Sequence, residues 1–241
     1  MTVTWEELGW ERVAPGVGRV RLPGWDCTAG LVSGRDGTLL IDAGSSLAEG
    51  ARLRSEAERL TGRRVTHLAL THPHFDHVFG AAALAGAEVY GPAGMDAVLA
   101  AGAEELRADA VRNGLDEDTA EEAAAALVRP RHPVSGELTL DLGGGRPVLL
   151  ADVGPGHTAH DLAVLVPGGT GVVFCGDLVE ESGEPQAGPD AVPSRWPAAL
   201  DRLLALGGDD ALYVPGHGAV VDAAFVRAQR DALAARFGVS P

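Results

Sequence analysis

Four candidate metal ligands stand within six residues of this chain, directly after a short apolar run. The run covers residues 65–70, and His72, His74, Asp76 and His77 follow it. A strand that ends in such a cluster brings imidazole and carboxylate groups, common ligands of zinc, to one edge of a sheet. Because side chains at i and i+2 share one side of an extended segment, His72 and His74 suit one ion, and Asp76 and His77 suit a second. The cluster predicts a metal centre at the end of a strand.

Three more candidate ligands lie downstream, each in a turn marked by glycine. His157 stands in Gly-Pro-Gly-His-Thr, Asp177 in Cys-Gly-Asp, and His217 in Pro-Gly-His-Gly. A single histidine is more often an ordinary hydrogen-bonded residue than a ligand, but the clustering outweighs that interpretation. Seven candidates over two ions, with one carboxylate shared, leave room for a bridging water, and ions about 3.5–4 Å apart are typical of metal-dependent hydrolysis. His67 and His132 have no such neighbours and are expected to be ordinary residues.

The composition argues against several classes of function. A net charge of −15 disfavours nucleic-acid binding, and all 19 basic residues are arginines, which excludes Schiff-base lysine chemistry. No apolar stretch approaches the roughly 20 residues of a membrane span, so no membrane partner is expected. The N-terminus lacks a secretory pattern, and Cys27 and Cys175 cannot make a disulfide framework. We expect a cytoplasmic protein, a monomer or homodimer, with a small-molecule substrate.

Strand and helix patterns predict one layered α/β domain over residues 1–241, in which helices cover sheets. Strands are expected at 17–22, 29–41 (a hairpin turning at 34–37), 65–70, 88–90, 137–142, 147–153, 162–166, 171–175 and 211–214. Helices are expected at 46–60, 79–84, 197–206 and 222–237. The alanine-rich, acidic stretch 93–127 is interpreted as two or three helices, broken at Gly102 and Gly114, that form an insertion within the domain.

Several residues near the motifs are expected to support the site or to line a substrate pocket. Asp42, which ends a buried strand, is expected to orient a ligand histidine, with a turn-capping role as the alternative. His160 and Asp161 either support the ligand that precedes them or begin a strand. The candidate pocket residues are Phe75, Phe79, Trp25, Glu180 and Trp196. The stretches 93–127 and 179–196 are expected to rim the site, although 93–127 would equally serve to cover a sheet.

In order along the chain, these motifs resemble those of the metallo-β-lactamase superfamily. The match includes Leu-Ile-Asp-Ala-Gly at the end of the first hairpin, the His-X-His-X-Asp-His motif, and the three later turns with His, Asp and His. The resemblance implies an αββα sandwich, in which two mixed sheets pack face to face with helices outside and the site at one edge. It implies His72, His74 and His157 for the first metal, Asp76, His77 and His217 for the second, and Asp177 as a bridge.

The same resemblance narrows the subfamily without assigning a substrate. True β-lactamases of the family usually carry Cys or Ser in place of the bridging Asp177. Glyoxalase II enzymes have an added C-terminal helical domain, whereas only 24 residues follow His217 here. Related lactonases place a Tyr where this chain has Glu180, and persulfide dioxygenases carry a different stretch after the aspartate. The nuclease branch carries further domains or motifs, so a hydrolase of unassigned substrate remains.

The predicted chemistry is hydrolysis of an ester, lactone, thioester or amide by a water activated between two Zn²⁺ ions. Asp76 would orient or deprotonate this water, and Asp177 would hold both ions. Because every ligand atom is nitrogen or oxygen, iron or manganese could replace zinc. The alternatives are an iron-dependent enzyme similar to glyoxalases or persulfide dioxygenases, a true zinc β-lactamase, and a metal-binding protein without catalysis.

Overall fold

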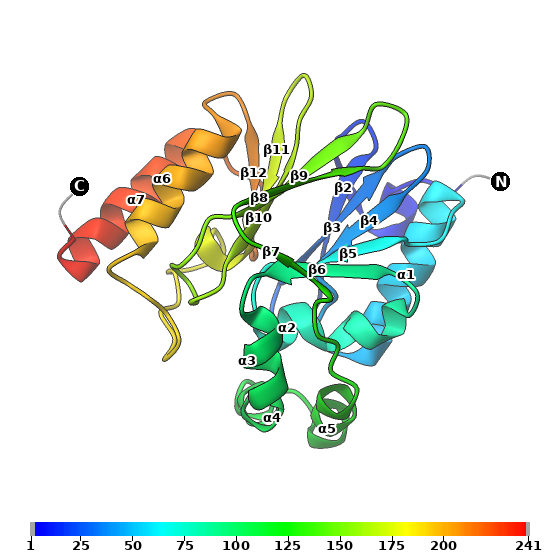
Figure 1. Cartoon of the computed structure of the whole chain (residues 1–241), viewed down its shortest axis with the longest axis horizontal. Helices are drawn as coiled ribbons and strands as arrows, with labels where there is room; N and C mark the ends of the chain where they lie inside the picture. Colours follow the sequence, from blue (N-terminus) through cyan, green and yellow to red (C-terminus); the bar gives the residue numbers. More distant parts are fainter. Residues whose placement is uncertain (1–2, 240–241) are drawn as a thin grey trace.

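Two sheets pack face to face with helices on both outer sides, as Figure 1 shows for the computed structural model, which describes residues 3–239. The first sheet has the order β1 (Glu11–Ala14), β2 (Val17–Arg21), β3 (Thr28–Ser33), β4 (Thr38–Ile41), β5 (His67–Ala69), β6 (Glu88–Pro92) and β7 (His132–Val134). The second has the order β12 (Leu212–Val214), β11 (Val172–Phe174), β10 (Leu162–Val166), β9 (Pro147–Asp152) and β8 (Glu137–Asp141). Both sheets are mixed: β4 to β7 and the β11–β12 pair are parallel, and the other neighbours are antiparallel.

The helices complete four layers, which confirms the predicted αββα sandwich. The α-helices are α1 (Leu47–Thr61), α2 (Phe75–Val78), α3 (Met95–Ala101), α4 (Ala103–Arg112), α5 (Glu117–Ala125), α6 (Trp196–Gly207) and α7 (Ala223–Phe237). Three 3-10 segments accompany them: η1 (Glu6–Leu8), η2 (Phe79–Leu84) and η3 (Gly176–Leu178). In Figure 1, α6 and α7 lie beyond the second sheet, whereas α1 and α2 to α5 lie on the side of the first. No helix within residues 3–239 combines the length and apolar character needed to cross a membrane.

Alternating apolar residues give the sandwich three apolar layers, of which the central one joins the sheets. On β4, Leu39 and Ile41 face the second sheet, while Leu40 packs with the outer helices of the first. Val164 on β10 likewise faces inward, and Ala163 faces α6 and α7. This period of two is what a strand between two apolar layers requires, and it fixes the register of both sheets.

The α1 helix illustrates how local signals set an element beside the site. Ser46 caps its N-terminus by accepting a hydrogen bond from the Glu49 backbone N–H, and Gly62 ends it in the left-handed conformation. Leu53 and Ala57 are fully buried on the face that covers the first sheet. The helix predicted at 46–60 is therefore confirmed to within one residue at each end.

The structure also departs from the predicted elements. Strands β1 and β7 were not expected: β1 is exposed along half its length, and β7 has three residues, one of them proline. Neither carries the apolar alternation on which strand prediction depends. The stretch 93–127 forms three helices, which confirms the breaks at Gly102 and Gly114, and the helix expected at 79–84 is the 3-10 segment η2.

Candidate metal centre

Turns after four strands bring the seven predicted ligands to one edge of the sandwich. The turn after β5 leads into α2, which has His74 as its N-cap residue, and carries the first four ligands. His157 follows β9, Asp177 lies in η3 after β11, and His217 follows β12. These last three strands end on the same side because β12 is parallel to β11, and β9 is separated from β11 by one antiparallel strand. Segments far apart in the sequence therefore meet at one site.

The seven side chains form two groups that share one carboxylate. The ligand atoms of His72, His74, His157 and Asp177 all lie within 4.8 Å of one another, as do those of His77, Asp177 and His217. Asp76 belongs to the second group, since its Oδ2 lies 3.3 Å from His217 Nε2. The Oδ2 atom of Asp177 lies 3.5 Å from His157 Nε2 and 3.3 Å from His217 Nε2. The geometry therefore offers two adjacent ion positions with Asp177 between them.

Each of the five histidines holds one ring nitrogen in a hydrogen bond and leaves the other facing the site. The acceptors are Thr71 Oγ1 for His72 (2.9 Å), Asp190 Oδ2 for His74 (3.0 Å), Asp42 Oδ2 for His77 (2.8 Å), the Gln186 carbonyl for His157 (3.1 Å) and the Trp25 carbonyl for His217 (2.7 Å). Such bonds fix the tautomer and the ring orientation of metal-binding histidines. The remaining nitrogens, Nδ1 of His74 and Nε2 of the other four, point into the cluster. Those of His74 and His157 lie 3.0 Å apart, and a metal ion would replace the hydrogen bond between them.

Asp42 organises two of these histidines at once. Its Oδ1 accepts the Thr71 backbone N–H and its Oδ2 the Thr71 hydroxyl, each at 2.8 Å, and Oδ2 also accepts the Nδ1–H of His77. Because the Thr71 hydroxyl is donated to Asp42, its oxygen is free to accept the Nδ1–H of His72. Asp42 is 2% exposed and adopts a positive φ of 60°, a conformation that aspartate tolerates better than most residues. Asp42 therefore has the contacts that are expected of a residue that orients ligand histidines.

Replacing Asp42 by alanine is expected to weaken metal binding about 10- to 100-fold. The change removes three buried hydrogen bonds and frees the ring of His77 to rotate. Competition with a coloured chelator measures the affinity. Asp36→Ala, at an exposed turn before β4, is the matched control, and equal metal affinities in the two variants would contradict the role of Asp42.

Two buried polar atoms at the centre make no hydrogen bond within residues 3–239, although one of them, Oδ1 of Asp177, lies 3.2 Å from His77 Nε2. They are Nε2 of His72 and Oδ1 of Asp177, neither of which has a hydrogen-bond partner. Leaving such groups unpaired costs about 1–3 kcal/mol each, which a protein rarely tolerates without a ligand. A cation between them would satisfy both atoms. The residues present therefore fit the binding of divalent metal.

Burial and mutual attraction shift the pKa values of the cluster in opposite directions. Burial lowers the pKa of His72 well below its usual range and that of His157 to about 4. Burial also disfavours the charged form of His217, but Asp177 outweighs it and raises the pKa of His217 to about 12. Conversely, burial opposes the ionisation of Asp177, but the surrounding histidines, His77 first, hold its pKa well below the usual range. Without metal, the site is an ion pair of carboxylate and imidazolium.

Zinc binding at neutral pH is expected to release protons, because a coordinating imidazole must be neutral. The raised pKa of His217, about 12, means that this ring carries a proton at pH 7 that the metal must displace. Metal affinity should therefore rise with pH, by about tenfold per unit for each proton released. Calorimetry in buffers of different ionisation enthalpy counts the protons. Zinc binding without proton release, or with an affinity independent of pH, would contradict the assignment of His217.

Asp161 and His160 belong to the turn that presents His157. Asp161 is 3% exposed, and its carboxylate accepts hydrogen bonds from the backbone N–H and hydroxyl of Thr158. Burial raises the pKa of Asp161 to about 7. The ring of His160 instead packs against Gly94, and none of its hydrogen bonds within the described residues reaches a ligand. Asp161 thus shapes the turn, and His160 lies apart from the ligands.

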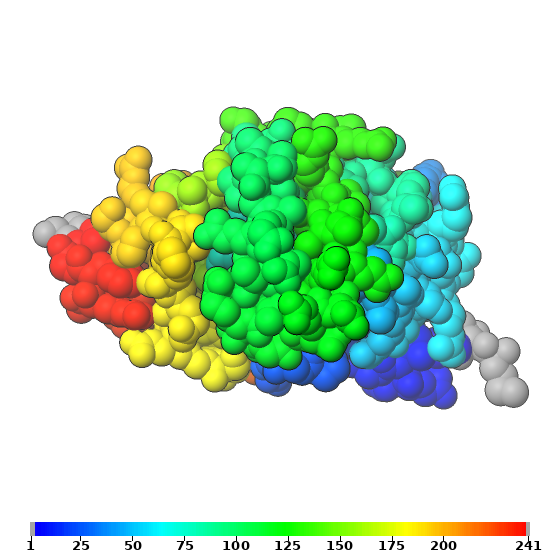
Figure 2. All heavy atoms as spheres, turned by 90° about the horizontal axis from the view of Figure 1, so that it is seen from below, coloured from blue at the N-terminus to red at the C-terminus, as the bar shows by residue number. Residues whose placement is uncertain are grey.

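A cavity of about 590 Å³ opens onto the ligand cluster. Its walls come from the turn at Trp25, from α2, from α3 and α4, and from residues 180–190. Figure 2 shows the green helices α3 to α5 beside the yellow segment on this face of the molecule. Apolar side chains such as Phe75, Val98 and Leu106 alternate with polar ones around the opening. Both stretches expected to rim the site contribute to it.

Three of the five predicted pocket residues line this cavity, namely Trp25, Phe75 and Glu180. Phe79 does not: it is 1% exposed and packs in the core under α1. Trp196 is also fully buried, with its ring 5.4 Å from that of His157 and its indole N–H donated to the Leu178 carbonyl. It supports a ligand from behind and does not meet the cavity. Proximity in sequence to a motif does not determine the side to which a side chain points.

Other residues of the site carried no recognisable signal. Asp190, in a loop rich in proline and glycine, bonds His74 across 116 positions of sequence. The Cys27 Sγ atom lies 3.2 Å from the Asp76 carbonyl and 3.7 Å from both ring nitrogens of His77. Burial raises the pKa of the Cys27 thiol to about 12, so this group is neutral beside the cluster. These contacts depend on the tertiary fold, which no local pattern encodes.

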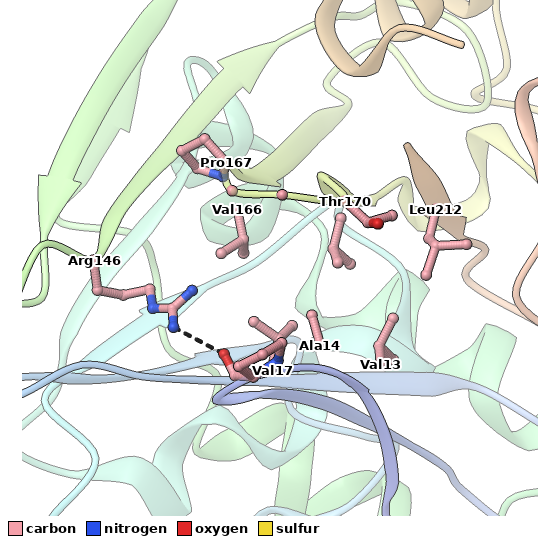
Figure 3. A pocket seen from close by; sticks show the side chains of 12 residues that line it. Val13, Ala14, Val17, Arg146, Val166, Pro167, Thr170 and Leu212 are labelled. Atoms are coloured by element: carbon pink, nitrogen blue, oxygen red, sulfur yellow. Dashed lines mark hydrogen bonds between the residues drawn. The ribbon is translucent and has the colours of Figure 1, made fainter. Parts of the chain in front are cut away.

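A second cavity, of about 410 Å³, lies at the opposite ends of the strands. Figure 3 shows it between Val13, Ala14 and Val17 on one side and Val166, Thr170 and Leu212 on the other. Arg146, its one charged residue, donates a hydrogen bond to the Pro15 carbonyl at 2.8 Å. The predicted ligands lie at the other cavity, which is therefore the candidate functional site.

Comparison with known proteins identifies the family. The family model described as "Metallo-beta-lactamase superfamily" matches residues 22–217. A metallo-beta-lactamase from Pontibacter korlensis is similar, with a TM-score of 0.72 and 20% identity, over 92% of this chain and 98% of that one. FIM-1 from Pseudomonas aeruginosa, in a mono-zinc form, has a TM-score of 0.71 and 20% identity, over 96% of both chains. A metallo beta lactamase from Erythrobacter litoralis, with beta mercaptoethanol in its active site, has a TM-score of 0.70 and 18% identity, over 94% and 96%. The solved structures share the fold, and the chain belongs to the metallo-beta-lactamase superfamily.

Proposed function

We propose that this protein is a hydrolase with two metal ions, preferably Zn²⁺, that cleaves an ester, lactone, thioester or amide of a small molecule. The observation that carries the proposal is the orientation of the five histidines. Each gives one nitrogen to an oxygen acceptor. The other nitrogen lies within 4 Å of Asp76 or Asp177 in four of them, and in His74 it lies 3.0 Å from His157 Nε2. Histidines with only a structural role would not each need an oxygen acceptor that directs the other ring nitrogen at one shared cluster of buried polar atoms.

The site has the parts that hydrolysis needs. Two divalent ions, when bound, lower the pKa of water and polarise a carbonyl. Asp76 is 7% exposed and lies at the cavity, so its carboxylate can hold a water and take its proton. Asp177 fixes the distance between the two groups of histidines, and Trp25 and Phe75, whose rings meet edge to face, exclude bulk water on one side.

A panel of acyl compounds on metal-defined protein tests the proposal. Metal-free protein is reloaded with Zn²⁺, Mn²⁺ or Fe²⁺ and assayed with aryl esters, lactones, thioesters and a chromogenic β-lactam. We expect hydrolysis of at least one class to require metal, to stop on chelation and to return on reloading. Hydrolysis of only the β-lactam would indicate a zinc β-lactamase, and oxygen consumption with a thiol substrate would indicate the iron-dependent alternative. Protein with two bound ions that hydrolyses no compound would overturn the proposal.

The His132→Gln variant, at a half-buried residue of β7, is a suitable control for this panel. His132 pairs with Glu88 on the first sheet and stacks on Tyr90, away from the cavity. Its metal content and turnover should equal those of the unaltered protein. The cytoplasmic location and the monomeric or homodimeric state are part of the same proposal.

A further inference from the structure

The charged side chains around the catalytic cavity are unbalanced. Apart from the ligands, five acidic residues line it: Glu105, Asp109, Glu180, Glu184 and Asp190. Arg112 is the one basic residue of the lining, and it is committed to Asp109 at 3.0 Å. The chain has no lysine to reach in from elsewhere. A substrate carboxylate would therefore find no free cationic partner among the described wall residues.

Three of these acids have a cationic or imidazole partner, and two do not. Asp109 pairs with Arg112, Asp190 bonds His74 at 3.0 Å, and Glu184 lies 3.5 Å from Arg236. No ion pair within residues 3–239 involves Glu105 or Glu180. The carboxylates of Glu105 and Glu180 are therefore the two in the cavity lining that are free to bind a charged group of a ligand.

Glu180 is a buried and positioned group. It is 8% exposed, its backbone N–H is held by Gln229 at 3.0 Å, and its Oε1 accepts the Ser182 hydroxyl at 2.8 Å. Its Oε2 atom has no hydrogen-bond partner within the described residues, and the residue lines the cavity three positions after the ligand Asp177. Burial raises the pKa of Glu180 to about 7, so a cation that reaches its open Oε2 would favour the charged carboxylate.

Aromatic surface completes this wall. Trp25 and Phe75 line the same cavity with ring centroids 5.2 Å apart, and the Trp25 indole N–H is already donated to the Asn113 carbonyl. Aromatic faces attract organic cations, and a carboxylate nearby adds a direct charge interaction. The cavity thus has an electropositive end, at the metal positions, and an acidic, aromatic wall.

Building on the proposed function, we propose that the substrate is an acyl compound with a cationic group, such as an alkylammonium, that Glu180 binds while the carbonyl lies at the metals. The acidic wall would correspondingly disfavour acyl compounds with a carboxylate at that position. Glu180 and the metal positions would then attract two different groups of one substrate within the same cavity, which also fixes its orientation.

The test uses small thiols that bind the metals and differ in their second group. Cysteamine carries an ammonium, 2-mercaptoethanol a hydroxyl and 3-mercaptopropionate a carboxylate. Binding to Co²⁺-loaded protein is followed by sulfur-to-cobalt absorption at one mildly alkaline pH, without any need for turnover. Thiols differ in intrinsic acidity, so the quantity compared is the change in relative affinity between variants.

We expect Glu180→Gln to lower the affinity ratio of cysteamine to 3-mercaptopropionate about tenfold, because it removes one charge at nearly constant shape. Glu105→Gln, in the solvent-facing wall, should lower this affinity ratio about threefold. If Glu180→Gln does not fold, the Glu105→Gln variant alone tests the inference. Glu137→Gln, exposed on β8 outside the cavity, is the matched control and should leave the ratio unchanged.

An unchanged ratio in the Glu180 and Glu105 variants would overturn the inference. This outcome differs from failure of the proposed function, in which thiols bind the loaded site but no acyl compound is hydrolysed. Protein that binds neither Co²⁺ nor thiols would overturn both.

Discussion

Replacing Asp177 by alanine is expected to lower metal-dependent hydrolysis by about 10³-fold and to leave one tightly bound ion in place of two. Asp177 is the one side chain common to both groups of ligand atoms. Its loss removes a negative charge from between two ion positions and leaves the second group with Asp76, His77 and His217 alone. Metal analysis after gel filtration and kcat/KM on the best substrate measure the two effects.

Two further variants separate the role of Asp177 from general damage. Asp177→Asn keeps the shape of the side chain but not its charge. It should lose most of the hydrolytic activity and of the second-ion binding that Asp177→Ala loses. Asp118→Ala, exposed in the first turn of α5, should retain both ions and full activity. Circular dichroism of each metal-free protein reports folding. Undiminished activity and two retained ions in folded Asp177→Ala would show that this carboxylate does not bridge the site.

Replacing Gly216 by alanine is expected to have the second large effect. A β-carbon at Gly216 would overlap Oδ1 of Asp177 and lie 2.8 Å from the backbone carbon of Gly176. The backbone cannot easily yield, because Gly216 donates to the Gly176 carbonyl at 2.9 Å and accepts from the Thr28 N–H at 2.7 Å. The carboxylate of Asp177 must therefore move away from its position.

The expected result of Gly216→Ala is a loss of about 1–3 kcal/mol in the free energy of unfolding of metal-free protein. The second ion should also bind at least about 100-fold more weakly, since a displaced carboxylate no longer spans both positions. Urea unfolding and competitive metal titration measure these quantities. The control is Gly169→Ala, in the turn between β10 and β11, where a β-carbon would meet no atom within 4 Å. Equal behaviour of the two variants would contradict the close approach of Gly216 to Asp177.

Local signals were sufficient to predict most of the elements that carry the ligands. Strands β4 and β11 are buried throughout, β5 is buried after its first residue, and glycine marks the turns after β9, β11 and β12. The ligand types and spacing within residues 72–77 follow from one strand end and one short helix. Such features are encoded by neighbouring residues, which a sequence displays directly.

What escaped prediction depends on contacts between distant segments. The edge strands β1 and β7 exist because a neighbouring strand pairs with them, not because their own residues alternate. The burial of Phe79 and Trp196 is decided by α1 and by the packing of α6 on the second sheet. Asp190 reaches His74 from a loop without periodicity. Substrate preference belongs to this second kind of information, because the cavity wall is assembled from four separate segments.

The number of metal ions that the site holds decides most directly whether Asp177 bridges a two-metal centre. Titration of metal-free protein with Zn²⁺, followed by native mass spectrometry, should reach a plateau at two ions per chain. The same titration of Asp177→Ala should reach a plateau at one. Saturation of the unaltered protein at one ion or none, or two ions in both proteins, would contradict a two-metal centre bridged by Asp177.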